Sequence, residues 1–284
     1  MRRFVPLAAL LALLLMDAAA AAAPPTKEQI LDEALLHEGR KRTYRLLLPR
    51  GFDKKRPVPL VLALHGGGGT ATQLDRSTNG QFRRAANRRG WVVVFPQGIA
   101  KGWNDGRPLT SRRDRQRKGV DDVAFLSTLI DHLHKTRGID RSRVYATGIS
   151  NGGFMSFRLG LELSQKIAAI PPVTANLAKV HDGKRPQHAV GLLVINGTKD
   201  PLVPYAGGEV RVLGKSRGKI HSTDESLRRW AAFNGCAPTI TTQPLPDVAK
   251  GDGARAYVHT WSGCKGGAGV ELIRVQGGGH TWPG

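Results

Sequence analysis

The chain has 284 residues, with 43 Lys and Arg against 22 Asp and Glu, a formal net charge of +21 and two cysteines. This length can bury a sizeable core, and the 40% share of hydrophobic residues excludes a disordered chain or a disulfide-dense miniprotein. The one long apolar run lies at the N-terminus, which excludes a protein that crosses a membrane many times.

The first 23 residues have the pattern of a secretory signal peptide. Arg2 and Arg3 precede an apolar stretch over residues 4–16, and the alanines of residues 18–23 offer cleavage sites after small side chains. The apolar stretch is shorter than the roughly 20 residues that a membrane-spanning helix needs, which disfavours the alternative of an uncleaved anchor. We therefore expect residues 1–23 to be removed, leaving no stable membrane anchor.

The mature chain is expected to be secreted or periplasmic. No repeat or linker divides residues 24–284, so we expect one domain there. Cys236 and Cys264 are the only cysteines in the sequence. An oxidising compartment favours a disulfide between them over two free thiols.

Basic residues are spread along the mature chain and are densest in residues 101–118. This stretch contains seven basic and two acidic residues, and Trp103 is its only aromatic residue. It contains no nucleic-acid-binding motif, so we expect a solvated basic surface and no nucleic-acid partner. Weak binding to anionic polymers of the cell envelope is the alternative.

Beyond residue 27, short runs of Val, Ile and Leu alternate with segments of helical spacing. Nearly all-apolar strands that alternate with helices predict an α/β fold, with a mostly parallel sheet covered on both faces. The clearest helix, over residues 122–137, carries one apolar stripe and ends before Gly138. Strands are predicted over residues 42–48, 60–64, 91–95, 144–147, 191–196 and 271–275. The other predicted helices cover residues 81–89, 153–163 and the segment between Ser222 and Gly235, and irregular segments are expected at 102–118, 171–189 and 205–220.

Residues 148–152 have the spacing Gly-x-Ser-x-Gly, with Ser150 at the centre. They follow the predicted strand 144–147 and open the predicted helix 153–163, the setting in which a sharp turn exposes a serine nucleophile. The glycines remove Cβ atoms that would clash in such a turn, and the helix N-terminus stabilises developing negative charge. A glycine-rich turn without a catalytic role is the alternative, but the surrounding strand and helix favour the nucleophile.

Four glycines follow the strand 60–64 and His65. In acyl transfer, the oxyanion of the tetrahedral intermediate needs two hydrogen-bond donors, one of them the N–H of the residue after the nucleophile, here Asn151. The glycine loop can supply the second, with Gly67 as the preferred donor and Gly68 as the alternative. A phosphate-binding loop is disfavoured because no Lys-Ser/Thr follows and the spacing is not G-x-G-x-x-G. His65 is expected to support the loop.

A serine nucleophile needs a neutral imidazole to accept its proton and a carboxylate to orient that imidazole. Asp200 follows the predicted strand 191–196, and His280 follows the predicted strand 271–275 through three glycines. Both lie beyond the carboxyl ends of strands, where an open parallel sheet gathers its site, so Ser150, Asp200 and His280 are the predicted catalytic residues. The other histidines downstream of Ser150 do not follow a strand through a glycine loop; they are His181, His188, His221 and His259. The alternatives to Asp200 as the acid are Asp182, Asp224, Asp247 and Asp252.

No metal site is expected. His132 and His134 are two residues apart on a predicted helix and cannot share a face, and neither HExxH nor paired CxxC spacing occurs. Asp121 and Asp122, at the start of that helix, are expected to stabilise its positive end rather than act in catalysis.

Together these motifs resemble the secreted α/β-hydrolase esterases of the polyhydroxybutyrate depolymerase and feruloyl esterase type. The likeness extends from about residue 42 to the end of the chain and rests on LVLALHGGGG, WND…GVDDVAFL, RVYATGISNGGFM, INGTKDPLVPY, the two cysteines and GGGHTWPG. It implies an α/β-hydrolase fold and no cofactor, with Ser150 as nucleophile, Asp200 as acid and His280 as base. It also implies a disulfide near the histidine-bearing loop. Such proteins usually continue past HTWPG with a helical segment, so we expect the C-terminus of this chain to be truncated.

The resemblance implies hydrolysis of carboxylic esters, of the polyhydroxybutyrate type or on feruloyl or acetyl groups of polysaccharide. Trp103 and Trp282 are candidates for the wall of an apolar substrate pocket, with ordinary packing as the alternative. Two other functions stay open: a serine peptidase of the same fold, and a catalytically silent protein that binds envelope polymers.

Overall fold

The computed structural model describes residues 27–283, so the predicted signal peptide lies outside the described residues. The strands are β1 (Gln29–His37), β2 (Arg40–Leu48), β3 (Val58–Leu64), β4 (Val92–Pro96), β5 (Ile139–Ile149), β6 (Ala169–Ile170), β7 (Pro172–Val173), β8 (Gly191–Gly197), β9 (Gly208–Val212), β10 (Lys215–Ile220), β11 (Ile240–Pro244), β12 (Arg255–Trp261) and β13 (Val270–Gln276). The helices are α1 (Ala71–Ser77), α2 (Gln81–Arg89), α3 (Arg112–Arg115), α4 (Asp122–Arg137), α5 (Asn151–Glu162) and α6 (Thr223–Phe233).

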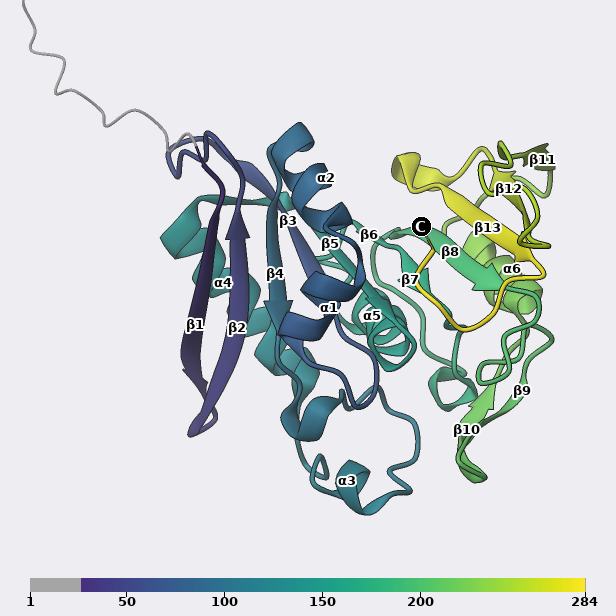
Figure 1. Ribbon diagram of the computed structural model, residues 1–284, viewed down its shortest axis with the longest axis horizontal. Coiled ribbons are helices and arrows are strands. Elements are labelled where there is room, and N and C mark those ends of the chain that lie inside the picture. The colour runs from purple at the N-terminus through teal and green to yellow at the C-terminus, as the bar shows by residue number, and fades with distance from the viewer. Residues whose placement is uncertain (1–26, 284) are drawn as a thin grey trace, which may run out of the picture.

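Eleven strands form one sheet, in the order β1-β2-β4-β3-β5-β6-β8-β13-β12-β11, with β7 pairing β5 and β8. From β4 to β13 in this order, each strand pairs with the next in parallel. Antiparallel strands extend both edges, β2 and β1 on one side and β12 and β11 on the other (Figure 1). The remaining strands, β9 and β10, form a separate hairpin.

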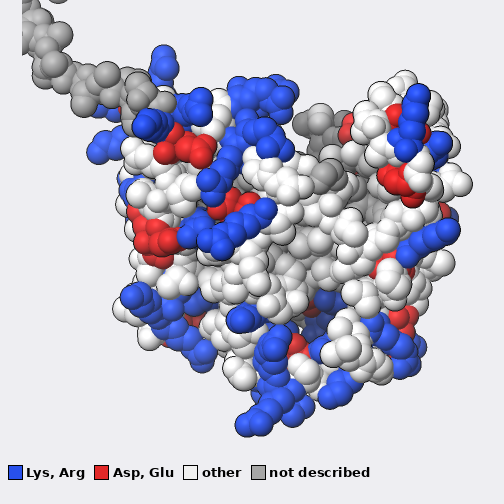
Figure 2. Space-filling model, in the orientation of Figure 1, with Lys and Arg blue, Asp and Glu red and all other residues white. Residues whose placement is uncertain are grey.

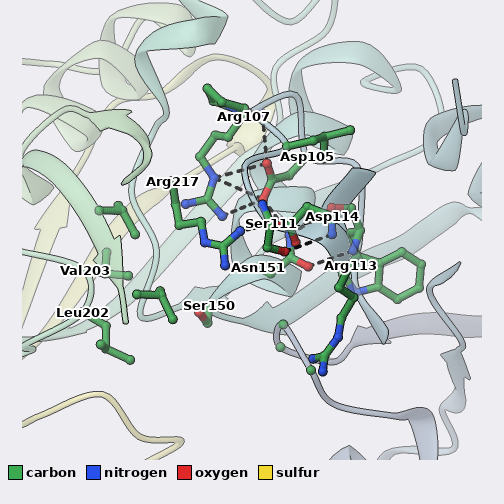
Figure 3. Close-up of a pocket in the computed structure, with 18 of the residues that line it drawn as sticks. Asp105, Arg107, Ser111, Arg113, Asp114, Ser150, Asn151, Leu202, Val203 and Arg217 are labelled. Atoms are coloured by element: carbon green, nitrogen blue, oxygen red, sulfur yellow. Dashed lines mark hydrogen bonds and ion pairs between the residues drawn. The ribbon is translucent and has the colours of Figure 1, made fainter. Parts of the chain in front are cut away.

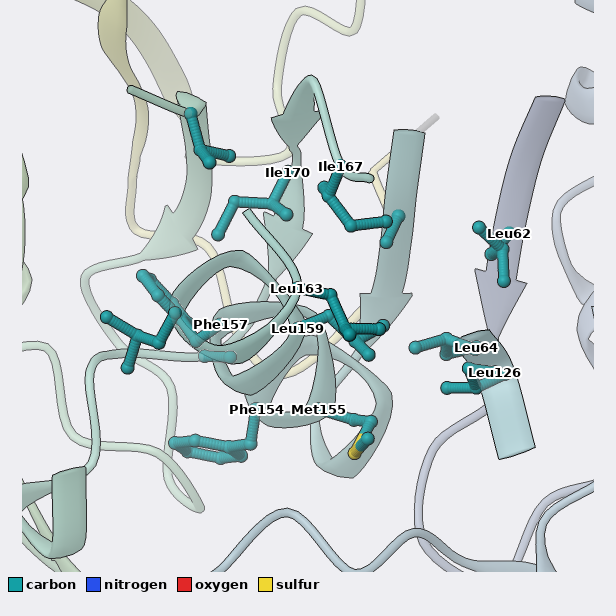
Figure 4. Close-up of a cluster of buried hydrophobic side chains, with 14 of the residues drawn as sticks. Leu62, Leu64, Leu126, Phe154, Met155, Phe157, Leu159, Leu163, Ile167 and Ile170 are labelled. Atoms are coloured by element: carbon teal, nitrogen blue, oxygen red, sulfur yellow. The ribbon is translucent and has the colours of Figure 1, made fainter. Parts of the chain in front are cut away.

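Helices cover both faces of the sheet. The larger core lies between one face and α4, α5 and α6, and a smaller core lies between the other face and α1 and α2. In Figure 4, apolar side chains of α5 such as Phe157 pack in the larger core, with Leu64 of β3 and Leu126 of α4 beside the same helix. This packing fixes the helix that begins directly after Ser150. Within residues 27–283, no helix has both the length and the apolar character needed to cross a bilayer.

The α/β fold with a mostly parallel sheet, predicted from the sequence, is confirmed. The six predicted strands and four predicted helices are present, and α4 has the predicted bounds, with Gly138 at φ 67° after its last turn. The expectation of an irregular segment over residues 205–220 is wrong, because most of it forms the β9–β10 hairpin. Residues 102–118 form a loop, as predicted, apart from the short helix α3.

A disulfide joins Cys236, just after α6, to Cys264, which precedes β13. The pairing agrees with the sequence-based prediction, but its expected position near the histidine-bearing loop is wrong. His280 follows the C-terminal end of β13, whereas Cys264 precedes the N-terminal end of the same strand. The disulfide therefore connects α6 to the start of β13 and does not support the loop that carries His280.

Candidate active site

Ser150 occupies the turn between β5 and α5 with φ 54° and ψ −118°, a conformation that non-glycine residues rarely adopt. A Cβ atom at Gly148 would lie 2.5 Å from the carbonyl oxygen of Leu64, and one at Gly152 would lie 2.1 Å from the same oxygen. Only glycine fits at these two positions, because the end of β3 passes directly against the turn. The N–H of Ser150 donates to the carbonyl of Val173 at 2.9 Å, which holds the turn against β7.

The glycine loop after β3 lies against the start of α5. A Cβ atom at Gly67 would lie 3.7 Å from the Cβ atom of Asn151, so the two backbone segments are in contact. The N–H of Gly68 donates to the carbonyl of Lys101 at 2.7 Å. Within residues 27–283, the N–H groups of Gly67 and Asn151 have no hydrogen-bond acceptor. Of the two glycines considered as donors from the sequence, Gly67 is the one whose N–H is available.

Asp200 and His280 meet beyond the C-terminal ends of the adjacent strands β8 and β13. His280 Nδ1 lies 2.7 Å from Asp200 Oδ2, and this hydrogen bond places the proton on Nδ1 and leaves Nε2 as the acceptor. The other carboxylate oxygen of Asp200 accepts the N–H groups of Leu202 and Val203, both at 2.8 Å. The Asp200 side chain is 2% exposed, so these bonds fix a buried carboxylate that in turn orients the imidazole.

Backbone contacts hold the two loops together. Lys199 donates its N–H to the carbonyl of Gly278, and Gly277 donates its N–H to Thr198 Oγ1, both at 2.9 Å. A Cβ atom at Gly197 would lie 2.3 Å from the carbonyl oxygen of Gly278. This close approach requires glycine at position 197, three residues before Asp200.

A cavity of about 620 Å³ opens at this end of the sheet. Ser150 and His280 both line it, together with Gly67 and Asn151. Figure 3 shows Ser150 and Asn151 at this cavity. Among the described residues, no hydrogen bond engages the Ser150 hydroxyl or His280 Nε2. The fold thus brings the Ser150 hydroxyl and the His280 imidazole to one cavity, and the buried Asp200 carboxylate contacts that imidazole from behind the cavity lining.

Other histidines and carboxylates do not form an alternative centre at this cavity. His221 Nε2 lies 2.7 Å from Asp182 Oδ1, but neither residue lines the cavity that contains Ser150. His181 Nε2 donates to the carbonyl of Asp105 at 2.9 Å. Within the described part of the chain, no group of three or more His, Cys, Asp or Glu side chains is arranged to hold a metal ion.

His65 supports the glycine loop, in the role expected from the sequence. Its Nδ1 donates to the carbonyl of Gly66 at 2.8 Å, and its Nε2 accepts the N–H of Gly98 at 3.1 Å. The carbonyl of His65 accepts the indole N–H of Trp103 at 2.9 Å. Burial lowers the pKa of His65, so the neutral imidazole that these two bonds require is the favoured form.

A buried carboxylate that the sequence analysis did not single out connects the basic loop to the Ser150 turn. Asn151 Nδ2 donates to Asp105 Oδ2 at 2.7 Å, and Asn151 Oδ1 accepts the N–H of Trp103 at 2.7 Å. Burial raises the pKa of Asp105, but the ion pair with Arg107 and the hydrogen bonds to the carboxylate outweigh burial and hold the pKa below its usual range. The Trp-Asn-Asp sequence was the signal that could have identified Asp105.

Asp121 and Asp122 have different roles at the start of α4. Asp121 caps the helix, as predicted, by accepting the N–H of Ala124 at 2.9 Å. Asp122 is fully buried, pairs with Arg42 at 2.7 Å and accepts the N–H of Asn104 at 2.8 Å. Asp122 therefore also positions the loop that carries Asp105, which the sequence analysis did not predict.

The two tryptophans considered as pocket walls lie at different cavities. Trp103 borders the cavity of Ser150, but its side chain is fully buried and its ring centroid lies 5.0 Å from that of His65. Trp282 lies at a second cavity of about 800 Å³, where it packs against Phe82 and donates its indole N–H to Gln81. The expectation that Trp282 lines the pocket of Ser150 is therefore corrected: its ring packs against α2.

The lowered pKa of His65 predicts a pH dependence of stability. Above the unfolded-state pKa of about 6.5, the stabilisation by neutral His65 is fully present. It is lost as the pH falls from that value toward the lower pKa of the folded state, because the unfolded chain binds the proton first. We expect His65→Gln to reduce the loss of unfolding free energy between pH 7 and pH 5, measured by urea denaturation.

The matched control is His188→Gln, which removes an exposed imidazole whose ring has no hydrogen bond in the described structure. This variant should retain the wild-type pH dependence. A wild-type pH dependence in His65→Gln would contradict the role assigned to burial of His65.

Comparison with known proteins assigns the family. The family model described as "Putative esterase" matches residues 37–169. The chain is 32% identical over 259 residues to "Putative esterase NocK" of Nocardia uniformis subsp. tsuyamanensis, covering 87% of this chain and 72% of that protein. It is also 32% identical over 240 residues to feruloyl esterase B of Piromyces equi, covering 82% of this chain but only 41% of that longer protein.

A solved structure agrees with this assignment at the level of the fold. Acetyl xylan esterase from Aspergillus awamori matches 90% of this chain and 95% of its own, with a TM-score of 0.58 and 16% sequence identity. Such a likeness shows a shared α/β-hydrolase fold. By its relatives, the chain belongs to the esterase family that includes feruloyl esterases, and it is a carboxylic-ester hydrolase.

Proposed function

We propose that Ser150, His280 and Asp200 form the catalytic triad of a serine esterase. The observation that carries this proposal is that the Ser150 turn and the His280–Asp200 hydrogen bond open onto one cavity. Ser150 Oγ attacks the ester carbonyl while His280 Nε2 accepts its proton, and Asp200 stabilises the resulting imidazolium. His280 then protonates the leaving alcohol. Water activated by the same imidazole hydrolyses the acyl-enzyme and releases the acid.

The backbone N–H groups of Gly67 and Asn151 are the proposed donors to the oxyanion. Both belong to residues that line the cavity, and neither N–H is used within the described residues. Asn151 begins α5, so the positive end of the helix adds to the stabilisation of negative charge. Because Trp103 and Asp105 hold the Asn151 side chain, the N–H of Asn151 is fixed before substrate binds.

Feruloyl and acetyl esters of polysaccharide are the proposed substrate class. Polyhydroxybutyrate-type esters were also expected from the sequence, and the names of feruloyl esterase B and acetyl xylan esterase favour the polysaccharide esters. One wall of the cavity is aliphatic and includes Leu202, Val203 and Val210, which suits an acyl or aryl group.

We further propose that the mature protein acts outside the cytoplasm. The disulfide between Cys236 and Cys264 supports this location, because disulfides persist in oxidising compartments. Its basic surface would bind anionic envelope polymers weakly and reversibly, as an addition to catalysis. We propose no nucleic-acid partner.

Replacement of Ser150 tests the proposed function directly. Ser150→Ala removes the nucleophile, so kcat on p-nitrophenyl acetate and methyl ferulate should fall by about 10⁴ or more. A fluorophosphonate probe should label the wild-type protein stoichiometrically and leave the variant unlabelled. Unchanged turnover in a folded Ser150→Ala protein, checked by circular dichroism, would end the proposal.

The pairs His280–Asp200 and His221–Asp182 provide a matched test of the proposed role of Asp200. Asp200→Asn should lower kcat by about 10⁴, because the amide favours the wrong tautomer of His280. Asp182→Asn changes a carboxylate that lies at the same 2.7 Å from a histidine but outside the cavity, and should leave kcat within about twofold. Equal losses in the two variants would show that Asp200 has no special role.

A further inference from the structure

The cavity that contains Ser150 has two chemically different walls. In Figure 3, Leu202 and Val203 lie on one side of Ser150 and Arg113 lies on the other. Figure 2 shows Lys and Arg gathered at the lower edge of this face, where Figure 1 places α3. The aliphatic wall consists of Leu202, Val203, Val210, Val212 and Leu213, and the basic wall contains Arg107, Arg112, Arg113, Arg117 and Arg217.

The carboxylates of the cavity do not balance these guanidinium groups. Asp105 is paired with Arg107 at 2.7 Å. Asp114 is shared between Arg117, at 2.8 Å, and Arg217. Among the described residues, these two aspartates are the only acids that line the cavity, so five guanidinium groups meet two carboxylates.

Two arginines of the basic wall are left without a carboxylate. Within residues 27–283, neither Arg112 nor Arg113 has an acidic oxygen within 4.0 Å, and both side chains are exposed. Arg113 Nη1 lies 3.3 Å from the position of a Cβ atom at Gly68. The guanidinium of Arg113 therefore lies beside the loop that carries Gly67, at the edge of the space where an ester carbonyl would bind.

The neighbouring arginines show the same excess of positive charge. Burial lowers the pKa of Arg117, and the guanidinium groups of Arg107 and Arg113 lower it further, against the opposite effect of the nearby carboxylates. Burial and Arg107 also lower the pKa of Arg217. An anion bound beside Arg113 would therefore lie in a positive potential to which Arg107, Arg117 and Arg217 also contribute.

From the geometry and charge of this wall, we infer that the preferred substrates are esters that also carry a carboxylate, and that Arg113 binds this carboxylate. The inference rests on the proposed function, because it takes Ser150 as the nucleophile. Arg113 can bind a carboxylate through two parallel N–H donors, while the aliphatic wall contacts the apolar part of the substrate. The carboxylate is either part of the acyl group or part of the leaving alcohol, as in an acidic polysaccharide.

Two matched pairs of esters test the preference in the mature protein. Mono-p-nitrophenyl glutarate and its methyl ester differ by a carboxylate on the acyl side. The pair 3-acetoxybenzoate and methyl 3-acetoxybenzoate differ by a carboxylate on the alcohol side. We expect kcat/KM to favour the anionic member of one pair by about tenfold, and the preference to shrink as NaCl is added.

Two variants separate Arg113 from the general positive charge. Arg113→Gln should lower the anionic-to-neutral ratio of kcat/KM by about tenfold. Arg115→Gln removes the same charge from an exposed residue of α3 that does not line the cavity, and should leave the ratio unchanged. A ratio that falls equally in both variants would assign the preference to bulk charge and overturn the role of Arg113.

A binding measurement keeps this inference separate from the proposed function. The amide counterparts of the four esters are titrated calorimetrically into Ser150→Ala, which binds without turnover. Tighter binding of an anionic amide, lost in Ser150→Ala/Arg113→Gln, would support the inference. Equal Kd values within both pairs would overturn it even if the wild-type protein hydrolyses neutral esters. Absence of all esterase activity would refute the proposed function, and the titrations would still decide the question of the carboxylate.

Discussion

The parallel pairing of β8 with β13 positions the candidate site. In this register Val275 lies opposite Gly197, so the two strands end together and their loops leave the sheet side by side. The approach of Gly197 to the carbonyl of Gly278 then brings Asp200 to 2.7 Å from His280, across 80 residues of sequence. Without this pairing, the Asp200 carboxylate could not orient the His280 imidazole.

The fold class and the polar groups of the site could be predicted because each depends on a local pattern. Apolar strands alternating with amphipathic helices define the sheet, and a loop after a parallel strand must open at its carboxyl end. Ser150 is recognisable because β3 leaves no room for a Cβ atom on either side of the turn. Asp200 and His280 are recognisable because glycines that allow close backbone approach accompany both loops.

The features that were missed have weak local signals or depend on long-range contacts. Residues 205–220 are rich in Gly, Lys and Arg, and their apolar alternation is limited to Val210 and Val212, so the local β9–β10 hairpin was not predicted. Asp105 has neighbours such as Asn151 that are distant in sequence, and only the folded chain shows their hydrogen bond. Trp282 is two residues from His280, yet the chain turns so that its ring packs beside Phe82. Proximity in sequence was a poor guide to the lining of the cavity.

A structure of the protein after inactivation with diethyl p-nitrophenyl phosphate would test the central claim most directly. The account predicts a diethylphosphoryl group on Ser150 Oγ, with its phosphoryl oxygen within hydrogen-bond distance of the N–H groups of Gly67 and Asn151 and with His280 beside Oγ. Phosphorylation of another residue, or a phosphoryl oxygen turned away from both N–H groups, would contradict it.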